Sequence, residues 1–283
     1  MRTLSIGLVL LLLCYACSGK KEKEGSLQRE PVKAEDSLSD SEDTLVMDSV
    51  AKAAIPKNLD ETFDDFVYTY AKDRRFQLLR TRFPLPFVTD STKTTVDRKE
   101  WIHDDLYTHQ EFYNMLFDKE SDMDYEKKTD VNKVYVAWLF LDKQKTRRYN
   151  FERVNGEWTL LNITEKSLRK NPNEDFLKFF YRFCNDSVYQ RNHVEQSLKF
   201  TTSDPEDEFN VIEAFISVDQ WFVFRPALPH KKMTNINYGQ PYSAKTQQKI
   251  VAFRGIGNGY SNTLFFSRKG GEWILTAYED FSN

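Results

Sequence analysis

Residues 57–87, KNLDETFDDFVYTYAKDRRFQLLRTRFPLPF, recur in diverged form as residues 170–200, KNPNEDFLKFFYRFCNDSVYQRNHVEQSLKF. Ten of the 31 aligned positions are identical, where unrelated segments would share about two. A match of this length at one constant offset indicates an internal repeat rather than a shared motif. We therefore predict two divergent copies of one domain, the first over residues 58–166 and the second over residues 171–283.

Each copy ends in three strand-like runs. They are Val134–Leu141, Arg147–Val154 and Trp158–Ile163 in the first copy, and Lys249–Gly255, Asn262–Arg268 and Trp273–Tyr278 in the second. The pairs Asn155-Gly156 and Gly270-Gly271 separate the last two runs of each copy and are typical of two-residue hairpin turns. Val134–Leu141 is apolar on both faces, so this strand needs cover from both sides of its sheet.

Each copy also opens with a helix. In the first copy an apolar stripe recurs at helical spacing through Leu59, Phe63, Phe66, Val67 and Tyr70. Asn58 and Asn171 are expected to cap the two helices, with Glu61 and Glu174 completing a capping box. A helix followed by a three-stranded meander predicts an α+β fold in which the helix packs on one face of a curved antiparallel sheet.

A helix, a middle segment and a three-strand meander in about 110 residues resemble the cone of the nuclear-transport-factor-2-like fold. The resemblance covers residues 58–283, and its carriers are core and turn residues such as Phe63, Phe176 and the two Gly-Glu-Trp turns. It implies two tandem cone-like domains. It implies no chemistry, because one fold hosts many functions.

Residues 1–16 have the pattern of an export signal. Arg2 is followed by the apolar run Leu4–Leu13, which is too short to span a membrane. Ala16-Cys17-Ser18-Gly19 then resembles a bacterial lipoprotein signal, and this implies lipidation of Cys17 as the mature N-terminus. The two copies behind such a signal resemble envelope lipoproteins of Gram-negative bacteria that carry an uncharacterised tandem domain. We expect a lipid-anchored protein of the cell envelope, at the outer membrane, facing the periplasm or the surface.

Residues 17–57 are predicted to be a disordered tether. From residue 18 on they contain no aromatic residue, nine acids and seven bases, so they cannot bury enough apolar surface to offset chain ordering. The pattern acid, hydroxyl, aliphatic occurs three times and resembles an O-glycosylation sequon of exported proteins. It implies possible modification at Ser37, Thr44 and Ser49.

Composition argues against several classes. The chain has 283 residues, 40 Lys and Arg against 43 Asp and Glu, and a formal net charge of -3. Nucleic-acid binding is not expected, because it needs clustered positive charge. Cleavage before Cys17 would remove Cys14, which leaves Cys184 as the one unmodified thiol and excludes an internal disulfide. Cys184 stands among phenylalanines and is expected to be a buried apolar side chain.

The one cluster of histidines and acids is His103, Asp104, Asp105 and His109. On a helix, Asp105 and His109 would share a face and His103 would point away. This pair could seat a metal ion or form an acid–base dyad, although an exposed ion pair is the more common outcome. No motif in the predicted mature chain indicates a metal site or a cofactor.

The middle segments are rich in aromatic residues, with Trp101, Tyr107, Phe112, Tyr113 and Phe117 in the first copy and Trp221, Phe222 and Phe224 in the second. Core packing accounts for most of them, and a surplus at a cone mouth could line a pocket. We therefore expect a non-catalytic binding or interaction module that meets an envelope protein or a small ligand. The alternative is a hydrolase or isomerase that uses the acid–base pair of the first copy.

Overall fold

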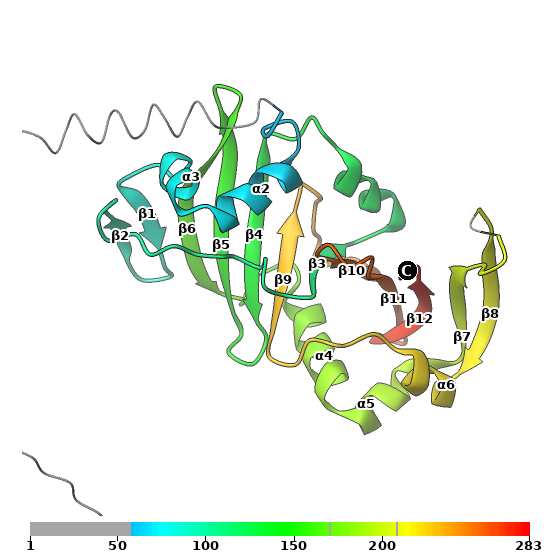
Figure 1. The fold of residues 1–283 in the computed structure, drawn as a ribbon. Coiled ribbons are helices and arrows are strands. Elements are labelled where there is room, and N and C mark those ends of the chain that lie inside the picture. The colour runs from blue at the N-terminus through cyan, green and yellow to red at the C-terminus, as the bar shows by residue number, and fades with distance from the viewer. Residues whose placement is uncertain (1–57, 170, 208) are drawn as a thin grey trace, which may run out of the picture. The chain divides into compact units, whose positions relative to one another are not determined.

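The computed structural model describes residues 58–169, 171–207 and 209–283, which belong to one compact unit built on a single mixed sheet of twelve strands (Figure 1). The predicted signal, Cys17, the tether and its hydroxyl residues Ser37, Thr44 and Ser49 lie outside the described residues. None of the described helices is long and apolar enough to cross a membrane.

Apart from one 3-10 helix, the first half of the described chain contains eight helices and strands and ends before residue 170. They are α2 (Phe63–Lys72), α3 (Arg74–Leu79), β1 (Leu85–Val88), β2 (Lys93–Val96), β3 (Phe112–Phe117), then β4 (Lys133–Phe140), β5 (Lys145–Val154) and β6 (Glu157–Ser167). A short 3-10 helix, η1 (Glu120–Lys127), connects β3 to β4.

The second half repeats this order with one additional helix. Its elements are α4 (Glu174–Asn185), α5 (Ser187–Asn192), β7 (Val194–Ser203), β8 (Val211–Ser217), α6 (Val218–Phe224), β9 (Lys232–Asn237), β10 (Gln248–Gly255), β11 (Ser261–Lys269) and β12 (Glu272–Asp280). The two halves therefore share the order of two helices and six strands, and they differ in η1 and α6.

All six strands predicted at the ends of the copies are present, as β4–β6 and β10–β12. The turn residues have positive φ angles, at 53° for Asn155, 86° for Gly156, 60° for Gly270 and 92° for Gly271. These are the backbone conformations that a two-residue hairpin requires at both central positions. The turn chemistry in the sequence was therefore a reliable guide to these two hairpins.

The predicted capping boxes are wrong, because the N-cap residues are Thr62 for α2 and Asn173 for α4 rather than Asn58 and Asn171. The amide of Glu61 donates to the carbonyl of Asn58 at 3.0 Å, so this segment is a turn that precedes α2. The helix begins at Phe63, and the hydroxyl of Thr62 accepts the amide of Asp65 at 3.1 Å. The physical reason lies in Asp60, whose carboxylate holds both Arg80 and the amide of Trp158 and so keeps the turn out of the helix.

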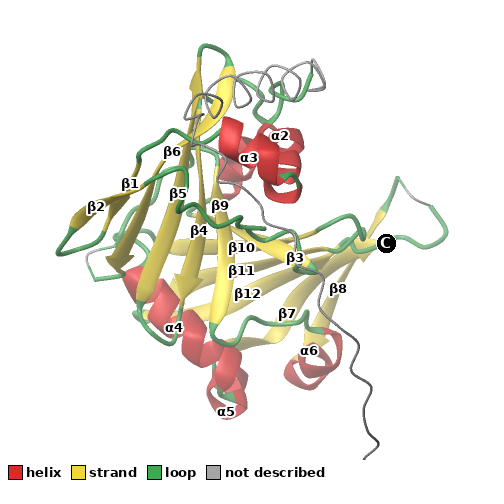
Figure 2. Cartoon of the chain, turned by 60° about the vertical axis from the view of Figure 1, so that its left-hand side comes forward, coloured by secondary structure: helices red, strands yellow, loops and turns green. Residues whose placement is uncertain are grey.

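The sheet does not divide into two separate meanders. Its strand order is β2-β1-β6-β5-β4-β9-β3-β10-β11-β12-β7-β8. Strand β9 of the second half pairs with β4 of the first half, and β3 of the first half pairs with β10 of the second. The two exchanged strands meet in the centre as a parallel pair, with Asn114 opposite Asn235. Figure 2 shows α2 and α3 on one side of the strands and α4 and α5 on the other.

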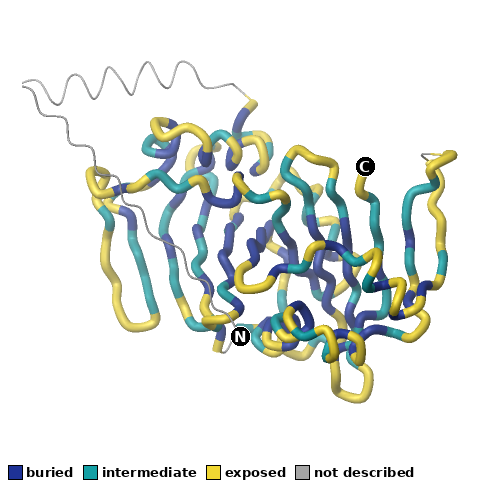
Figure 3. The backbone as a smooth tube through the Cα atoms, turned by 60° about the horizontal axis from the view of Figure 1, so that its bottom comes forward, coloured by how far each residue is buried: buried dark blue, intermediate teal, exposed yellow. Residues whose placement is uncertain are grey.

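The two halves bury opposite faces of the central strands. On β4, Val134, Val136 and Trp138 contact the core under α2, whereas Ala137 and Leu139 contact the core under α4. On β10 the same alternation occurs between Ile250 and Val251, which belong to different cores. This explains why the run at Val134–Leu141 is apolar on both faces, because side chains alternate along a strand and each face has its own helix. Figure 3 shows the central strands buried along most of their length, with the exposed segments at the sheet ends.

A buried glutamine in each half joins the helices to the chain around them. Gln77 and Gln190 are fully buried. Their amide groups donate to the carbonyls of Tyr70 at 2.9 Å and Phe183 at 2.8 Å, which are equivalent residues of α2 and α4. The identity of these two positions in the sequence repeat therefore reflects a shared hydrogen bond in the core.

Candidate binding site

The predicted acid–base residues lie at the surface of the first half. The segment around them is a loop and turn rather than a helix. The Nε2 atom of His103 lies 2.7 Å from the carbonyl of Ala71 and 3.2 Å from Asp105, and the Nε2 atom of His109 lies 3.2 Å from the other Asp105 oxygen. Both imidazoles therefore contact one carboxylate, which corrects the expectation that His103 points away.

None of these three residues lines any of the hollows described below. The side chain of His109 is 70% exposed and that of Asp105 is 52% exposed. No group of three or more His, Cys, Asp or Glu side chains in the described ranges is placed to hold a metal ion. The contact between His103 and Ala71 joins this loop to the end of α2.

The space between each helix and the sheet is filled by aromatic side chains. In the first half Phe63 packs edge-on against Phe151 and Trp158 at 5.3 and 5.1 Å between ring centres. In the second half Phe176 packs in the same way against Phe266 and Trp273 at 5.4 and 5.3 Å. Such contacts leave the helix-covered face of each half without room for a ligand at these rings.

Cys184 is a buried free thiol in the core of the second half, and burial raises its pKa. Because the thiolate is the reactive form, this environment suits an apolar packing role. Of the aromatic residues of the middle segments, Trp101, Tyr107, Phe117 and Trp221 are buried in the cores, while Phe224 is 51% exposed.

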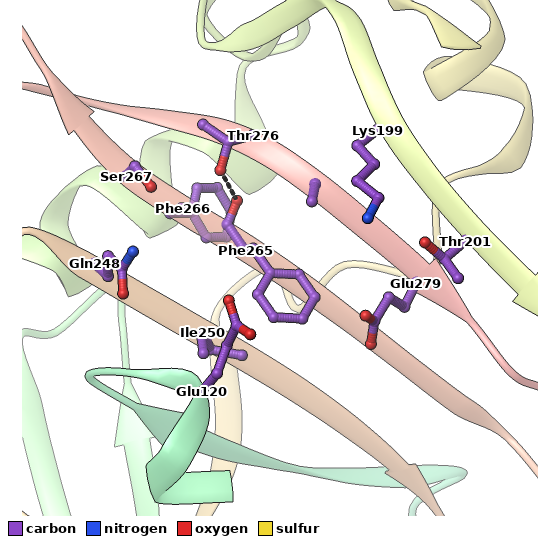
Figure 4. Close-up of a pocket in the computed structure, with 11 residues that line it drawn as sticks. Glu120, Lys199, Thr201, Gln248, Ile250, Phe265, Phe266, Ser267, Thr276 and Glu279 are labelled. Carbon is purple, nitrogen blue, oxygen red and sulfur yellow. Dashed lines mark hydrogen bonds between the residues drawn. The ribbon is translucent and has the colours of Figure 1, made fainter. Parts of the chain in front are cut away.

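A hollow of about 200 Å³ lies on the sheet face of the second half that α4 does not cover (Figure 4). The ring of Phe265 stands in its middle, with Ile250 on β10 and Ala277 on β12 as its directly paired neighbours. These three residues form the apolar floor. The wall is polar and contains Glu120 from η1, Lys199 and Thr201 from β7, Gln248 from β10, Ser267 from β11, and Thr276 and Glu279 from β12.

A β-bulge shapes this floor. The register between β11 and β12 shifts between Phe265 and Phe266, so Thr276 has no directly opposite partner and its hydroxyl donates to the carbonyl of Phe265 at 3.1 Å. A bulge bends its strand and redirects side chains. The bend places Ala277 and Glu279 on the same face as Phe265, in register with Lys199 and Thr201 on β7.

Two carboxylates face this hollow from different elements. Burial raises the pKa of Glu279 above its ordinary value, and the neighbouring Glu120 carboxylate raises it further, while Lys199 and Arg254 act in the opposite direction. Lys199 is itself paired with Glu213 at 2.7 Å, and this pairing raises the pKa of its ammonium group. The electrostatic environment of the hollow is therefore negative.

The first half has a hollow at the equivalent place with different chemistry. It is larger, at about 530 Å³, and its lining includes Arg148, Asn150, Asn162 and Lys166. Its bulge falls between Asn150 and Phe151, the equivalents of Phe265 and Phe266. Asn150 and Asn162 stand where the second half has Phe265 and Ala277, and they are hydrogen-bonded to each other at 2.8 Å. The apolar floor is therefore a property of the second half alone.

The free edge of the sheet lies beside the apolar-floored hollow. Strand β8 ends the sheet, and Phe215 on it is paired with Lys199 and is 72% exposed. Val211 on the same face is 55% exposed. Exposed apolar side chains on an unpaired edge are the usual mark of an interaction surface. We call the hollow together with Val211, Glu213 and Phe215 the open face.

Sequence reasoning did not find the open face. Its residues come from six elements, and none forms a motif in the chain. One signal was present, because the equivalent of β8 is the polar strand β2, and Thr95 occupies the place of Phe215. An apolar substitution at an exposed position in one copy of a repeat could have indicated a surface with a function of its own.

The fold and the open face together define a class of α+β proteins in which helices cover opposite faces of a large mixed sheet. A solved structure shares this fold, the crystal structure of an NTF2-like protein from Bacteroides fragilis NCTC 9343. That protein is 44% identical to this chain, which it matches with a TM-score of 0.77 over 81% of this chain and all of its own length. No curated protein matches the chain.

The chain belongs to the family described as Domain of unknown function (DUF4348), which it matches over residues 41–280. This match includes both halves, so the two copies occur together as one family unit. The resemblance to the NTF2-like fold that the sequence indicated is thereby confirmed at the level of fold.

Proposed function

We propose that the chain is a lipid-anchored protein of the cell envelope that acts as a non-catalytic binding module through its open face. The observation that carries this proposal is the contrast between the two faces of the second half. The helix-covered face is filled by its own aromatic rings, whereas the open face has a hollow with an apolar floor and a polar wall. Concave sites of this composition are the usual places for ligands and partners.

The proposal includes the division of the unit into two cone-like domains, 58–166 and 171–283, behind a lipoprotein signal of a Gram-negative envelope. Two aromatic cores, one under each helix pair, support this division. The NTF2-like protein from Bacteroides fragilis supports the assignment of the fold. Membrane attachment rests on the sequence at Ala16-Cys17, and binding rests on the open face.

The anchor can be tested by Cys17→Ser in a Gram-negative host. We expect the unchanged chain to label with palmitate and to sediment with membranes, because thioether-linked lipid at Cys17 would hold it there. The variant should lose the label and appear in the soluble fraction. A variant that stays in the membrane fraction without label would contradict anchoring through Cys17.

Binding at the open face can be tested with a photo-crosslinking amino acid placed at Phe215, with Thr95 as the matched control. Both positions are exposed and lie on equivalent edge strands, but only Phe215 borders the apolar-floored hollow. In the native envelope we expect a discrete adduct from position 215 and none from position 95. The 215 adduct should disappear when Phe265→Asp places a charge in the floor.

Equal adducts from both positions would indicate random collisions and would overturn the binding role of the open face. An adduct at 215 that survives Phe265→Asp would show that the partner contacts the edge strand without needing the hollow. The helical content of Phe265→Asp must match that of the unchanged chain, which circular dichroism can establish.

A further inference from the structure

The charges around the hollow of the open face do not balance. Two cations lie nearby, and each has a carboxylate of its own, since Lys199 pairs with Glu213 at 2.7 Å and Arg254 pairs with Glu126 at 2.8 Å. Glu120 and Glu279 remain. Neither carboxylate has a hydrogen bond or ion pair within the ranges that the structure describes. The charged residues that line the hollow are these two carboxylates and Lys199, so the lining carries a net charge of -1, and the charge of Lys199 acts on both carboxylates.

The two unpaired carboxylates lie on different sides of an aromatic ring. Figure 4 shows Glu120, from η1, on one side of Phe265, and Glu279, from β12, on the other. The ring is partly exposed between them. A cation above an aromatic face is attracted by the ring as well as by the carboxylates. This arrangement is suited to a positive group on an apolar stem.

A third observation is independent of the carboxylates. Thr201 is 93% buried, lines the hollow next to Glu279 and has no hydrogen-bond partner for its hydroxyl in the described part of the chain. Its oxygen is not one of the fully buried atoms that lack a partner, so the hydroxyl opens into the hollow, where a ligand group can form a hydrogen bond with it. The hydroxyl oxygen can accept a hydrogen bond from an N–H group.

These three features point to one ligand chemistry, and we infer that the open face binds an organic cation, a protonated amine or guanidinium on an apolar stem. The stem would lie on Ile250, Phe265 and Ala277, and the cation would lie between Glu120 and Glu279 with one N–H donated to Thr201. The volume of about 200 Å³ has room for a group of the size of an amino-acid side chain. This inference rests on the proposed binding function and specifies its ligand.

The charge of the ligand can be tested with three probes that share one ring. They are 2-phenylethylamine, 2-phenylethanol and phenylacetate, titrated into the full chain by calorimetry. We expect the amine to bind about tenfold more tightly than the alcohol, with the acid weakest, because a charge-assisted contact adds to ring burial. Phenylalanyl-arginine amide, titrated in parallel, distinguishes a peptide source of the cation from a free small amine.

The residues can be tested with conservative variants. Glu279→Gln and Glu120→Gln should each weaken binding of the amine by about tenfold, and Thr201→Val by about threefold. Glu152→Gln is the matched control, since it removes the same charge from the equivalent hollow of the first half and should change nothing.

Binding of the amine should also weaken as the pH falls. Because the pKa of Glu279 is raised, this carboxylate becomes protonated and neutral at a higher pH than an ordinary glutamate does.

Equal affinities for the amine, the alcohol and the acid would overturn the inference, as would binding of neither the amine nor the dipeptide. An equal loss of affinity for the amine in Glu279→Gln and Glu152→Gln would show that the cation does not bind between Glu120 and Glu279. The photo-crosslink at Phe215 distinguishes a failure of this inference from a failure of the proposed binding function. If the crosslink persists while cations do not bind, the binding module stands and its ligand is of another class.

Discussion

Neither half of the described unit is expected to fold as a monomer when the chain is divided between β6 and α4. The isolated first half would lack β9, which pairs with β4 at six positions from Tyr135 to Phe140. It would also lose Ile236 and Tyr238 from the core under α2. The isolated second half would lack β3, which covers β10 and contributes Leu116 to the core under α4.

We expect each separate half to show no cooperative unfolding transition, and co-expression of the two to restore a single folded particle. Circular dichroism and gel filtration provide the measurement. The matched control is the full chain with a protease site in the connection between β6 and α4, cut after folding, which should remain one particle. A stable, monomeric first half that unfolds cooperatively would contradict the structural importance of the strand exchange.

The second large effect is expected at Asp118, which follows β3 and neutralises a buried lysine. The side chain of Lys249 on β10 is 1% exposed, and its ammonium group contacts the carboxylate of Asp118 and the side-chain oxygen of Asn173. The pair therefore joins a strand of the first half to the start of α4 in the second. Removing one partner of a buried pair leaves an uncompensated charge.

Asp118→Ala should lower the free energy of unfolding by about 3–5 kcal/mol. This corresponds to a fall in melting temperature on the order of 10 °C for a unit of this size. The double variant Asp118→Ala, Lys249→Met should recover most of the loss, because replacing a whole buried pair with apolar side chains is close to neutral. Urea unfolding of the single and double variants measures both effects. A double variant as unstable as Asp118→Ala would assign the loss to other contacts of Asp118, such as the amide of Ser243.

The same pair predicts the sign of a pH effect. Burial lowers the pKa of Lys249 in the folded chain, while Asp118 raises it. Between this lowered pKa and the unfolded value of about 10.4, the unfolded chain binds more protons, so the free energy of unfolding rises with pH. In Asp118→Ala the folded pKa falls further, and the gain in stability from pH 7 to pH 9 should be larger than in the unchanged chain.

Local features of the fold were predictable from the sequence because local chemistry determines them. The hairpins at Asn155-Gly156 and Gly270-Gly271 follow from the positive φ that these residues adopt at low cost. Strand-like runs predicted the three closing strands of each half, and the run at Val134–Leu141 correctly indicated cover on both faces. The repeat itself predicted that both halves would open with a helix and close with three strands, and both do.

The capping of the first helix was less predictable. Asn58 and Glu61 have the spacing of a capping box, but the carboxylate of Asp60 binds Arg80, which lies 20 residues away. A contact that distant outweighs a local capping preference. The loop at His103 shows the same limit, since its two imidazole contacts to Asp105 depend on a backbone that is not helical.

The sequence by itself determined the repeat, the three closing strands of each copy, the hairpin turns between the last two of them, and the apolar faces that need cover. Only the tertiary structure decided which strands pair in the centre, because β3 is apolar on both faces at Met115, Leu116 and Phe117 and would fit beside either half. It also assembled the open face, since Glu120 and Glu279 are 159 positions apart in the chain and line one hollow only in the folded structure. The periodicity of apolar side chains depends on residues that are neighbours in the chain. Which strand pairs with which depends instead on the competition between whole strand edges in the folded sheet.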